Sequence, residues 1–296
     1  MAERSFHIGA SQHLAASLAP GLHLVATPIG NLGDVTLRAL SALAAADVVL
    51  CEDTRVSVRL LERYGIKAVM KPYHEHNAEA VRPAIIEALK NGAAFVLISD
   101  AGVPLVSDPG YRLVRACVEE GLAVHSLPGA SSVLTALTLS GLPSDAFTFI
   151  GFLPQKEKAR LDFLARFAGV PSTLIAFESP HRVLAALVDI ATVFPNRNMA
   201  LCRELTKLHE EVLRGTATEI HTILEKRESV KGEIVLVIAP PTDEVAPVSD
   251  EVIEAAITTA LQDHSASKAA SLISKEFSKP KDEIYARILR RKADGA

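Results

Sequence analysis

Between about residues 22 and 140, short apolar runs alternate with longer segments of helical periodicity, and this alternation constrains the fold more than any other feature. The apolar runs are Leu22–Thr27, Val48–Cys51, Phe95–Ser99 and Ala123–Leu127. The segments with helical periodicity are Thr36–Ala46, Val56–Tyr64, Asn77–Asn91, Tyr111–Glu120 and Ser131–Ser140. Strands joined through helices run parallel and are buried on both faces. The pattern therefore predicts an α/β domain whose largely parallel sheet carries helices on both faces.

A second series of strands and helices follows the turn at residues 141–143. Its predicted strands are Phe147–Phe152, Thr173–Phe177, Asn198–Cys202, Glu211–Arg214 and Ile234–Ala239. Its predicted helices are Lys156–Phe167, His181–Val193 and Ala217–Arg227. Because some neighbouring strands have no helix between them, antiparallel pairs are expected beside crossover connections. The chain should therefore contain two α/β domains, residues 21–142 and residues 143–240.

The two ends of the chain have a different character. Residues 1–20 resemble a flexible extension, and the proline-rich residues 241–249 resemble a linker. Residues 250–296 then contain three short helical segments, Asp250–Asp263, Lys268–Glu276 and Lys281–Arg291. From His264 onward, eight Lys and Arg residues stand against four Asp and Glu residues. This part is either a helix-turn-helix-like module that contacts a polyanion or an ordinary helical bundle with a basic face.

The composition excludes several classes of protein. No stretch approaches the roughly 20 apolar residues of a membrane-spanning helix, and the first residues lack the apolar block of a secretory signal. The three cysteines (Cys51, Cys117 and Cys202) have no CxxC spacing, and the ten histidines form no HExxH motif. We therefore expect a soluble protein of the reducing cytoplasm, without a disulfide framework or a metal site.

Glycine- and proline-rich turns follow three of the predicted parallel strands. They are Ala26–Asp34, Ile98–Gly110 and Leu127–Ser132. The first turn lacks both the GxGxxG pattern of dinucleotide-binding folds and the Gly-Lys-Ser/Thr of a P-loop. Parallel strands present their carboxyl ends at one edge of the sheet, where open α/β folds bind ligands. The three turns are therefore expected to meet in one binding site.

Single residues in these turns have expected roles. The Asp100–Pro104 loop should contact a ligand, because glycine allows close approach and a carboxylate accepts hydrogen bonds. Asp108 should instead cap the following helix, with Pro109 at its first position. Either Ser131 or Ser132 can cap the next helix, whose free N–H groups suit an anionic group such as a carboxylate.

Charged residues directly follow other predicted strands. They lie in the segments Cys51–Arg55, Phe177–Arg182 and Arg203–Lys207, whereas Lys231–Glu233 precedes the last predicted strand, where its glycine could allow close approach to a ligand. Each segment by itself is compatible with an exposed, self-paired loop. Their repeated position at strand ends favours a polar cleft. A serine hydrolase has no support, because no GxSxG motif is present.

Taken in order, these motifs resemble the tetrapyrrole methylase superfamily, the class III fold of S-adenosylmethionine-dependent methyltransferases, and within it the enzymes that methylate small-subunit ribosomal RNA. The stretches that carry the resemblance are Thr27–Asp34, Cys51–Arg55, Ser99–Pro104, Pro128–Ser132, Phe177–Arg182, Arg203–Lys207 and Lys231–Glu233. The likeness runs from about Leu22 to Ala239, and the basic tail is similar to the C-terminal helical module of that family. Residues 1–20 have no counterpart in it.

The resemblance implies a homodimer of two-domain α/β chains, each binding S-adenosylmethionine in the cleft between its domains. The implied reaction is 2′-O-methylation of a cytidine ribose in small-subunit (16S) ribosomal RNA, within the assembled small subunit and away from any membrane. The implied cofactor contacts are Pro28, Asp100, Ala101, Gly102, Val103, Pro104, Ser131, Ser132, Phe177, Leu205 and Gly232. The expected RNA contacts in the basic module are Lys268, Lys275, Lys279, Lys281, Arg287, Arg290 and Arg291.

A ribose hydroxyl must lose its proton as it attacks the methyl group, and this places demands on the protein. Holding oxygen, carbon and sulfur in line can supply much of the acceleration, and a general base about 10²–10⁴-fold more. The charged candidates for these tasks are Glu178, Glu204 and Lys207 in the second domain and Glu52, Asp53 and Arg55 in the first. A lysine needs a lowered pKa to act as the base, and the sequence leaves the choice open.

Two other functions are compatible with the sequence. One is a methyltransferase of the same fold that acts on a tetrapyrrole or another non-RNA acceptor, although such an acceptor gives no reason for a basic helical module. The other is a DNA-binding regulator whose α/β part senses a small ligand. The net charge of −4 argues against strong binding to arbitrary RNA, and this fits the preference for the assembled subunit that the resemblance implies.

Overall fold

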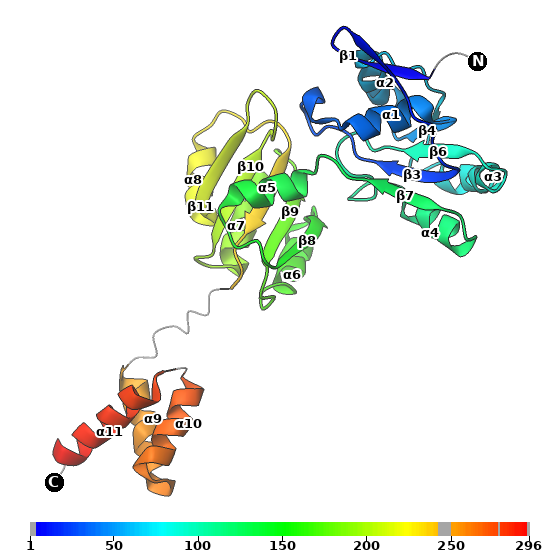
Figure 1. The fold of residues 1–296 in the computed structure, drawn as a ribbon. Coiled ribbons are helices and arrows are strands. Elements are labelled where there is room, and N and C mark those ends of the chain that lie inside the picture. Colours follow the sequence, from blue (N-terminus) through cyan, green and yellow to red (C-terminus); the bar gives the residue numbers. More distant parts are fainter. Residues whose placement is uncertain (1–3, 242–249, 278, 295–296) are drawn as a thin grey trace. The chain divides into compact units, whose positions relative to one another are not determined.

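The computed structural model describes residues 4–241, 250–277 and 279–294, which form two compact units (Figure 1). The first unit ends at Pro240 and contains two five-stranded sheets. The second unit begins at Pro241 and is helical. Except for Pro241, the predicted linker lies outside the described residues. Within the described ranges, no helix is both long and apolar enough to cross a membrane.

The first sheet is parallel throughout, with the strand order β5-β4-β6-β3-β7. Its strands are β3 (Gly21–Val25), β4 (Val48–Cys51), β5 (Met70–Pro72), β6 (Ala94–Leu97) and β7 (Val124–Leu127). One face is covered by α1 (Leu37–Ala45) and α2 (Thr54–Arg63), the other by α3 (Ala78–Lys90) and α4 (Tyr111–Glu119). The predicted parallel sheet with helices on both faces is confirmed. Only β5 is missing from the prediction, because three residues that include a lysine and a proline form no apolar run.

A crevice opens at the carboxyl edge of this sheet, between the neighbouring strands β3 and β6. The helix after β3 lies on one face of the sheet and the helix after β6 on the other, so the two loops diverge. The loops stay tied at one point, where Thr27 and Gly102 exchange backbone hydrogen bonds of 2.9 and 3.0 Å. The fold thereby brings two of the three predicted turns, those after β3 and β6, into direct contact.

The second sheet is mixed, with the strand order β11-β10-β12-β9-β8. Its strands are β8 (Phe147–Phe152), β9 (Thr173–Glu178), β10 (Asn198–Arg203), β11 (Glu211–Thr216) and β12 (Ile234–Ile238). β8 and β9 pair in parallel, whereas the remaining neighbours are antiparallel, as the sequence predicts. One face is covered by α6 (Glu157–Ala165), α7 (Val183–Val193) and α8 (Ala217–Glu225).

The opposite face of the second sheet is covered by α5 (Ser132–Ser140), which the sequence analysis assigned to the first domain. Its Val133, Ala136 and Leu137 are buried against small side chains of β10 and β12. The predicted domain boundary at residue 142 is therefore wrong for this helix. Periodicity predicts that α5 has an apolar face, but it contains no information about which sheet that face contacts.

The described part of the predicted flexible extension is an ordered β-hairpin. β1 (Ser5–Ile8) pairs antiparallel with β2 (Ser11–Leu14). The ring of Phe6 is only 5% exposed and joins the apolar core beneath α1 and α2. The prediction of a flexible extension is thus wrong for residues 4–20. The ring of Phe6 and a hydrogen bond from the backbone N–H of His7 to the carbonyl of Tyr64 (2.8 Å) anchor this hairpin, and an alternation as short as Phe6 and Ile8 is too weak a pattern to predict a strand.

An ion-pair cluster fastens the hairpin formed by β10 and β11, and Glu211 is at its centre. The Glu211 carboxylate accepts hydrogen bonds from Arg227 (2.6 and 2.8 Å) and from Arg203 (3.0 Å). Arg227, assisted by Arg203, lowers the pKa of Glu211 to about 2 against the partial burial that opposes it. The stabilising ionised form is therefore fully present above the ordinary pKa of 4.5 and is lost as the pH falls from there towards 2.

We expect the Glu211→Gln variant to unfold with a free energy about 1–2 kcal/mol lower than the wild type at neutral pH. This difference should shrink as the pH falls below 4.5 and approach zero only below pH 2, where Glu211 is protonated in both the folded and the unfolded chain. Urea unfolding at neutral pH and at several acidic pH values measures it. Glu225→Gln, a change at a carboxylate that is 68% exposed, is the control and should have little effect at any pH. Parallel pH profiles for wild type and Glu211→Gln would contradict the expectation.

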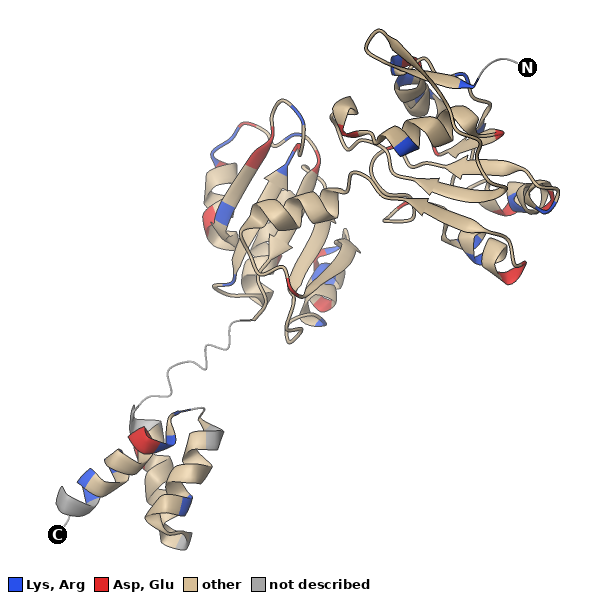
Figure 2. Cartoon of the chain, in the orientation of Figure 1, with Lys and Arg blue, Asp and Glu red and all other residues tan. Residues whose placement is uncertain are grey.

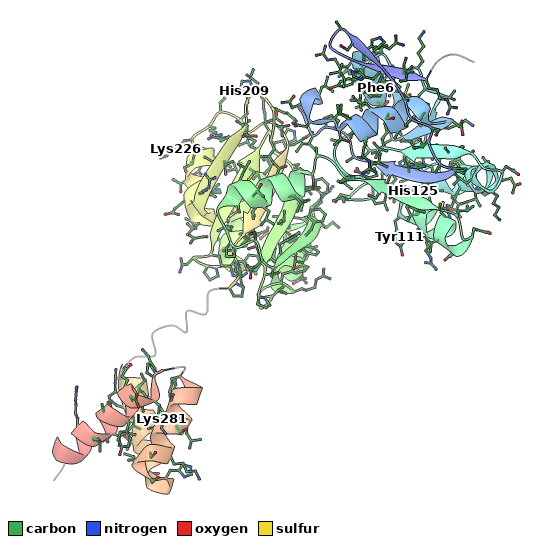
Figure 3. All side chains as sticks on the ribbon, in the orientation of Figure 1. Phe6, Tyr111, His125, His209, Lys226 and Lys281 are labelled. Atoms are coloured by element: carbon green, nitrogen blue, oxygen red, sulfur yellow. The ribbon has the colours of Figure 1, made fainter. Side chains whose placement is uncertain are left out.

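The second unit packs three helices around one small core. The helices are α9 (Asp250–Asp263), α10 (Ala266–Glu276) and α11 (Lys281–Asp294). The fully buried core consists of isoleucines and alanines, namely Ile253, Ile257, Ala269, Ala270, Ile273, Ile284 and Ile288. Lys and Arg residues occur on α10 and α11 (Figure 2), and the side chain of Lys281 at the start of α11 is exposed (Figure 3).

Candidate functional site

Loops from both sheets of the first unit line a cavity of about 390 Å³, called the first cavity below. They are the loop after β6, the start of α5, the end of β9 and the segment that leads into β12. The cavity brings together many of the expected cofactor contacts, namely Asp100, Ala101, Gly102, Val103, Ser131, Ser132, Phe177 and Gly232. Three expected contacts lie elsewhere. Pro28 lines a neighbouring cavity, and Pro104 and Leu205 are buried.

The loop after β6 holds its shape through left-handed backbone conformations. Gly102 has a φ of 81°, and the non-glycine residues Leu105 and Ser107 have φ values of 74° and 64°. Non-glycine residues rarely adopt this conformation, and they concentrate at functional sites. The hydroxyl of Ser99 donates to the carbonyl of Gly102 (3.2 Å), which closes the loop on itself. The surrounding structure thus fixes this wall of the first cavity.

Asp108 does not cap the helix that follows it, contrary to the expectation from the sequence. The N-cap of α4 is Gly110, with a φ of 138°, and no side chain caps this helix. Asp108 lies half-buried in the wall of the first cavity. Burial, reinforced by the charges of Glu52 and Asp100, raises the pKa of Asp108 to about 6. The capping rule fails here because α4 begins only at Tyr111, beyond the reach of this carboxylate.

Aromatic rings form the apolar side of the first cavity. Phe177, near the end of β9, lies edge-on to Phe149 and Phe152 of β8, with ring centroids 4.9 and 5.3 Å apart. Phe152 lines the cavity and is 55% exposed. The sequence analysis did not single out Phe152, and its position at the end of a predicted strand was the only signal. Nearby, Gly232 has a φ of 94°, and a Cβ there would lie 2.4 Å from Cγ of Glu204, so only glycine fits.

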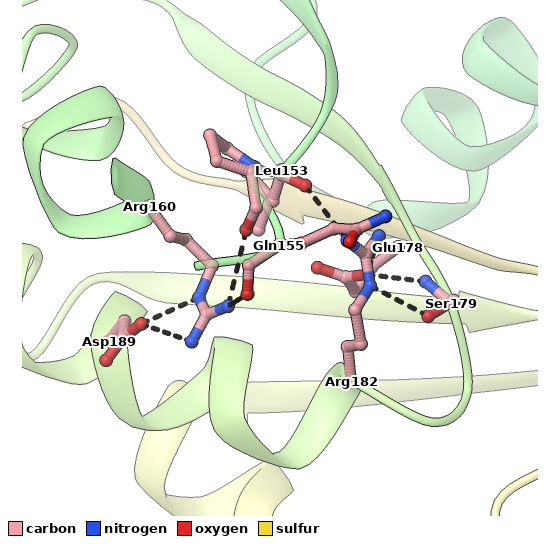
Figure 4. Close-up of polar contacts among 8 residues, drawn as sticks. Leu153, Gln155, Arg160, Glu178, Ser179, Arg182 and Asp189 are labelled. Carbon is pink, nitrogen blue, oxygen red and sulfur yellow. Dashed lines mark hydrogen bonds and ion pairs between the residues drawn. The ribbon is translucent and has the colours of Figure 1, made fainter. Parts of the chain in front are cut away.

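Glu178 is buried at the end of β9, and one of its oxygens has no partner. Oε1 accepts a hydrogen bond from the backbone N–H of Ser179 (2.6 Å) and pairs with Nη2 of Arg182 (2.6 Å) (Figure 4). Oε2 is buried and has no hydrogen-bond partner within the described part of the chain. Glu178 lines the first cavity, so this buried acceptor belongs to a residue of the cavity wall.

Two arginines hold the loop that follows β8 and flanks the first cavity (Figure 4). Arg182 donates to the carbonyl of Leu153 (3.4 Å), and Arg160 donates to the carbonyl of Gln155 (3.1 Å). Arg160 also pairs with Asp189 at 2.6 Å, and these two side chains are only 4% and 7% exposed. The loop conformation therefore depends on a buried ion pair.

Lys207 lies in a turn in which two carboxylates fix its position. Its Nζ lies 2.9 Å from Oε1 of Glu204 and 3.1 Å from Oε2 of Glu233. Glu204 and Thr206 in this turn have positive φ values of 52° and 66°. Burial by itself lowers the pKa of Lys207, but the hydrogen bonds to Glu204 and Glu233 outweigh it and raise the pKa above its usual value. The two carboxylates therefore hold Lys207 in place and favour its charged form.

Lys207 also lines a second cavity of about 400 Å³, which adjoins the first. Its other walls are residues 27–30 after β3, residues 98–101 after β6 and the first turns of α2. Asp100, Ala101 and Glu233 line both cavities. The two cavities thus share one wall, and the cation of Lys207 lies on the side of the second.

The common wall includes a carboxylate, that of Asp100. Burial raises the pKa of Asp100, although a hydrogen bond from the backbone N–H of Asp53 (3.3 Å) opposes the shift. Across the second cavity, the stem of Lys207 packs on Gly30, where a Cβ would lie only 2.5 Å from Cγ of the lysine. A proton-accepting group and a fixed cation therefore border the same space.

The three charged candidates after β4 have different positions. Asp53 caps α2 by accepting from the backbone N–H of Arg55 (2.8 Å), and it pairs with the guanidinium of Arg55 (2.7 Å). Arg55 is 89% exposed, so this pair is a surface feature. Glu52 instead lines a third cavity together with Asp108. Burial, with the charge of Asp100, raises the pKa of Glu52.

The expected RNA contacts of the second unit are mostly at its surface. Those exposed are Lys268, Lys281, Arg290 and Arg291. Lys279 and Arg287 are half-buried, and Arg287 pairs with Glu283 at 3.0 Å. The side chain of Lys275 lies outside the described residues. The exposed cations give this unit a surface that can contact a polyanion.

Comparison with known proteins identifies the family. The sequence profile of the tetrapyrrole (corrin/porphyrin) methylases matches residues 21–221. A relative from Mesorhizobium japonicum named ribosomal RNA small subunit methyltransferase I is 47% identical over 286 residues, which are 96% of this chain and 97% of the relative. A relative of the same name from Haemophilus influenzae is 42% identical over 268 residues, 89% of this chain and 94% of the relative.

Solved structures share the fold at lower identity. Uroporphyrin-III C-methyltransferase from Thermus thermophilus, complexed with S-adenosylhomocysteine, matches with a TM-score of 0.51 and 20% identity over 73% of this chain and 96% of that one. A conserved hypothetical protein from Aeropyrum pernix matches with a TM-score of 0.60 and 16% identity over 94% of this chain and 98% of that one. At such identities the likeness concerns the fold alone, and it confirms the predicted α/β fold of the tetrapyrrole methylase type. The chain therefore belongs to the tetrapyrrole methylase family and, within it, to the family of ribosomal RNA small subunit methyltransferase I.

Proposed function

We propose that this protein transfers a methyl group from S-adenosylmethionine to the 2′-hydroxyl of a cytidine ribose in small-subunit ribosomal RNA. Relatives that match nearly the whole chain are named as methyltransferases of small-subunit ribosomal RNA, and these names support ribosomal RNA as the substrate. The observation that carries the proposal is the pair of adjoining cavities. Because Asp100, Ala101 and Glu233 line both, a methyl donor in one can meet an acceptor in the other. A protein that only sensed a small ligand would need one cavity.

The residues of the first cavity fit the chemical groups of S-adenosylmethionine. Phe152 and Phe177 offer rings on which an adenine can pack. Ser131 caps α5 at the N–H of Leu134, and the other free N–H groups of that helix end suit the carboxylate of the cofactor. Oε2 of Glu178, buried and without a partner, can accept a hydrogen bond from the ammonium group or a ribose hydroxyl.

The second cavity would hold the target nucleotide between Lys207 and Asp100. S-adenosylmethionine, when bound, supplies an electrophilic methyl group. The fixed cation of Lys207 stabilises the negative charge that develops on the 2′-oxygen as its proton leaves. Asp100 accepts that proton, because its raised pKa makes it a better base than an ordinary aspartate. The sequence analysis had placed Asp100 only among the cofactor contacts.

The basic helical unit would supply affinity for RNA. Exposed cations such as Lys281 and Arg290 can contact phosphates and release their counterions, so binding should weaken as salt increases. The first unit would then contribute the reaction and the second the attachment to the substrate. A tetrapyrrole acceptor offers no reason for this second unit, which favours RNA as the acceptor.

Incubation with methyl-labelled S-adenosylmethionine and unmodified small ribosomal subunits tests the proposed function. The expected result is label on the 2′-oxygen of one cytidine, located by nuclease digestion and mass spectrometry. Label on a tetrapyrrole but not on RNA would favour the non-RNA methyltransferase. Salt-sensitive binding to duplex DNA without any methyl transfer would favour the DNA-binding regulator, and either result would contradict the proposal.

Removal of residues 241–296 should separate cofactor binding from action on RNA. The shortened chain should bind S-adenosylmethionine with a Kd within about twofold of the full chain, but its kcat/KM on small subunits should fall by about tenfold or more. In the full chain, the double variant Lys281→Gln/Arg290→Gln should show a smaller loss, which is largest at low salt and shrinks as salt increases. Lys158→Gln, a change at an exposed lysine of the first unit, is the control. Full activity of the shortened chain would contradict a role of the second unit in RNA binding.

A further inference from the structure

A third cavity, of about 420 Å³, lies at the carboxyl edge of the first sheet. It is bordered by the residues that follow β4 and β5 and by the first turns of α3 and α4. Ser107 and Asp108 line both this cavity and the first. The first cavity therefore adjoins two others. It shares Asp100 with the second cavity and Asp108 with the third. The proposed reaction uses only the first two.

Tyr73 contributes a buried hydroxyl to the third cavity. Its side chain is 1% exposed, and its backbone N–H donates to the carbonyl of Cys51 (2.8 Å), which fixes the residue directly after β5. The Tyr73 hydroxyl lies beside the guanidinium of Arg82, but in the described part of the chain neither this hydroxyl nor Nε of Arg82 forms a hydrogen bond of regular geometry. Such atoms are rare in folded proteins, because each has lost water without gaining a substitute. Two of them at one cavity point to a ligand that forms hydrogen bonds.

Carboxylates surround the same cavity. Glu52 and Asp108 lie close enough for the charge of Glu52 to add to burial in raising the pKa of Asp108. Glu75 and Glu79 also line the cavity. A ligand with N–H donors relieves the repulsion among these carboxylates, whereas a phosphate inside the cavity would increase it. The ligand should therefore present amino groups to this side.

The rim of the third cavity provides a ring and a cation. Tyr111, the first residue of α4, is 65% exposed (Figure 3). Arg112, the next residue, is exposed as well. Exposed aromatic side chains stack on unpaired nucleobases, and arginine contacts the phosphate beside a bound base. Ring, cation, carboxylates and buried hydroxyl together match the parts of one nucleotide.

We propose that the third cavity binds a nucleobase of the RNA strand next to the target cytidine. The exocyclic amino group of the base donates to the hydroxyl of Tyr73 and faces the carboxylates of Glu52 and Asp108. This assignment rests on the proposed function, because it places a neighbour of the target nucleotide on the same sheet edge. Cytosine, adenine and guanine carry an exocyclic amino group and uracil does not, so uracil should be disfavoured at this position.

Base substitutions in the RNA test the assignment, with wild type and Tyr73→Phe compared on each substrate. The substrates are small subunits whose RNA carries each of the four bases at either nucleotide beside the methylated cytidine. For the wild type, uracil at one of these positions should lower kcat/KM by about three- to tenfold. Tyr73→Phe removes one acceptor of the amino group and leaves the carboxylates, so it should reduce this preference by about half or more, while the Kd for S-adenosylmethionine changes less than about twofold.

The preference is a ratio between two substrates of the same protein, so a general loss of stability does not alter it. Tyr64→Phe is the control, because it removes a hydroxyl that donates to the carbonyl of Leu32 (2.6 Å) outside this cavity. This variant should keep the preference of the wild type. Equal rates for all flanking bases, or an unchanged ratio in Tyr73→Phe, would overturn the assignment and leave the proposed function intact. No methylation of RNA by the wild type would overturn both.

Discussion

Replacement of Lys207 by methionine is expected to lower kcat for methyl transfer by about 10²-fold or more, while the Kd for S-adenosylmethionine changes less than about twofold. Methionine keeps an unbranched stem to pack against Gly30 but carries no charge. The developing charge on the attacking oxygen then loses the cation that Glu204 and Glu233 hold in place. Single-turnover rates measure the chemical step, and calorimetry measures cofactor binding.

Two further variants show whether the position or only the charge of Lys207 matters. Lys207→Arg keeps the charge but changes its geometry, and it should retain more activity than methionine without reaching the wild-type rate. Glu233→Gln removes the more exposed partner, at 73% exposure, and should cost only a few fold, because Glu204 still holds Lys207 at 2.9 Å. Normal turnover of the methionine variant would show that positioning of the substrates suffices. A parallel loss of cofactor binding would place Lys207 in the cofactor site.

The sequence pattern predicts the two sheets well because their strands are almost continuous apolar runs. β4, β6 and β12 are buried at every position, so burial imposes the pattern on each residue. The hairpin around Phe6 and the placement of α5 are different, because both depend on contacts with distant parts of the chain. Local periodicity shows that an element has an apolar face but not where that face packs.

The same distinction applies to the site. Asp100 was expected there because strand ends of a sheet converge, and Gly232 because of the family resemblance; both line the first cavity. The properties of Lys207 depend on Glu233, which is far away in the sequence, so its fixed charge could not be predicted. Tyr73 gave no signal either, because an isolated tyrosine after a short polar strand looks like part of a loop until its burial is known.

Replacement of Arg160 by leucine is expected to lower the free energy of unfolding of the first unit by about 3–5 kcal/mol. Arg160 binds Asp189 through both Nε and Nη2 at 2.6 Å, and both side chains are almost fully buried. Leucine leaves the carboxylate of Asp189 buried without a counter-charge. It also removes the donor that binds the carbonyls of Pro154 and Gln155. Urea unfolding at neutral pH, followed by circular dichroism, measures the loss.

The double variant Arg160→Leu/Asp189→Leu identifies the source of that loss. If the unpaired carboxylate is responsible, the second substitution should restore most of the stability, because two apolar side chains can replace a buried ion pair at little cost. The loop after β8 would still lack its hydrogen bonds from Arg160, so the double variant should bind S-adenosylmethionine more weakly than the wild type even though it is folded. Arg115→Leu breaks an exposed pair with Glu119 and should change the stability by less than about 0.5 kcal/mol. If Arg160→Leu lowered the stability as little as Arg115→Leu does, water would have to reach Asp189. The ion pair would then not be a buried support of the cavity wall.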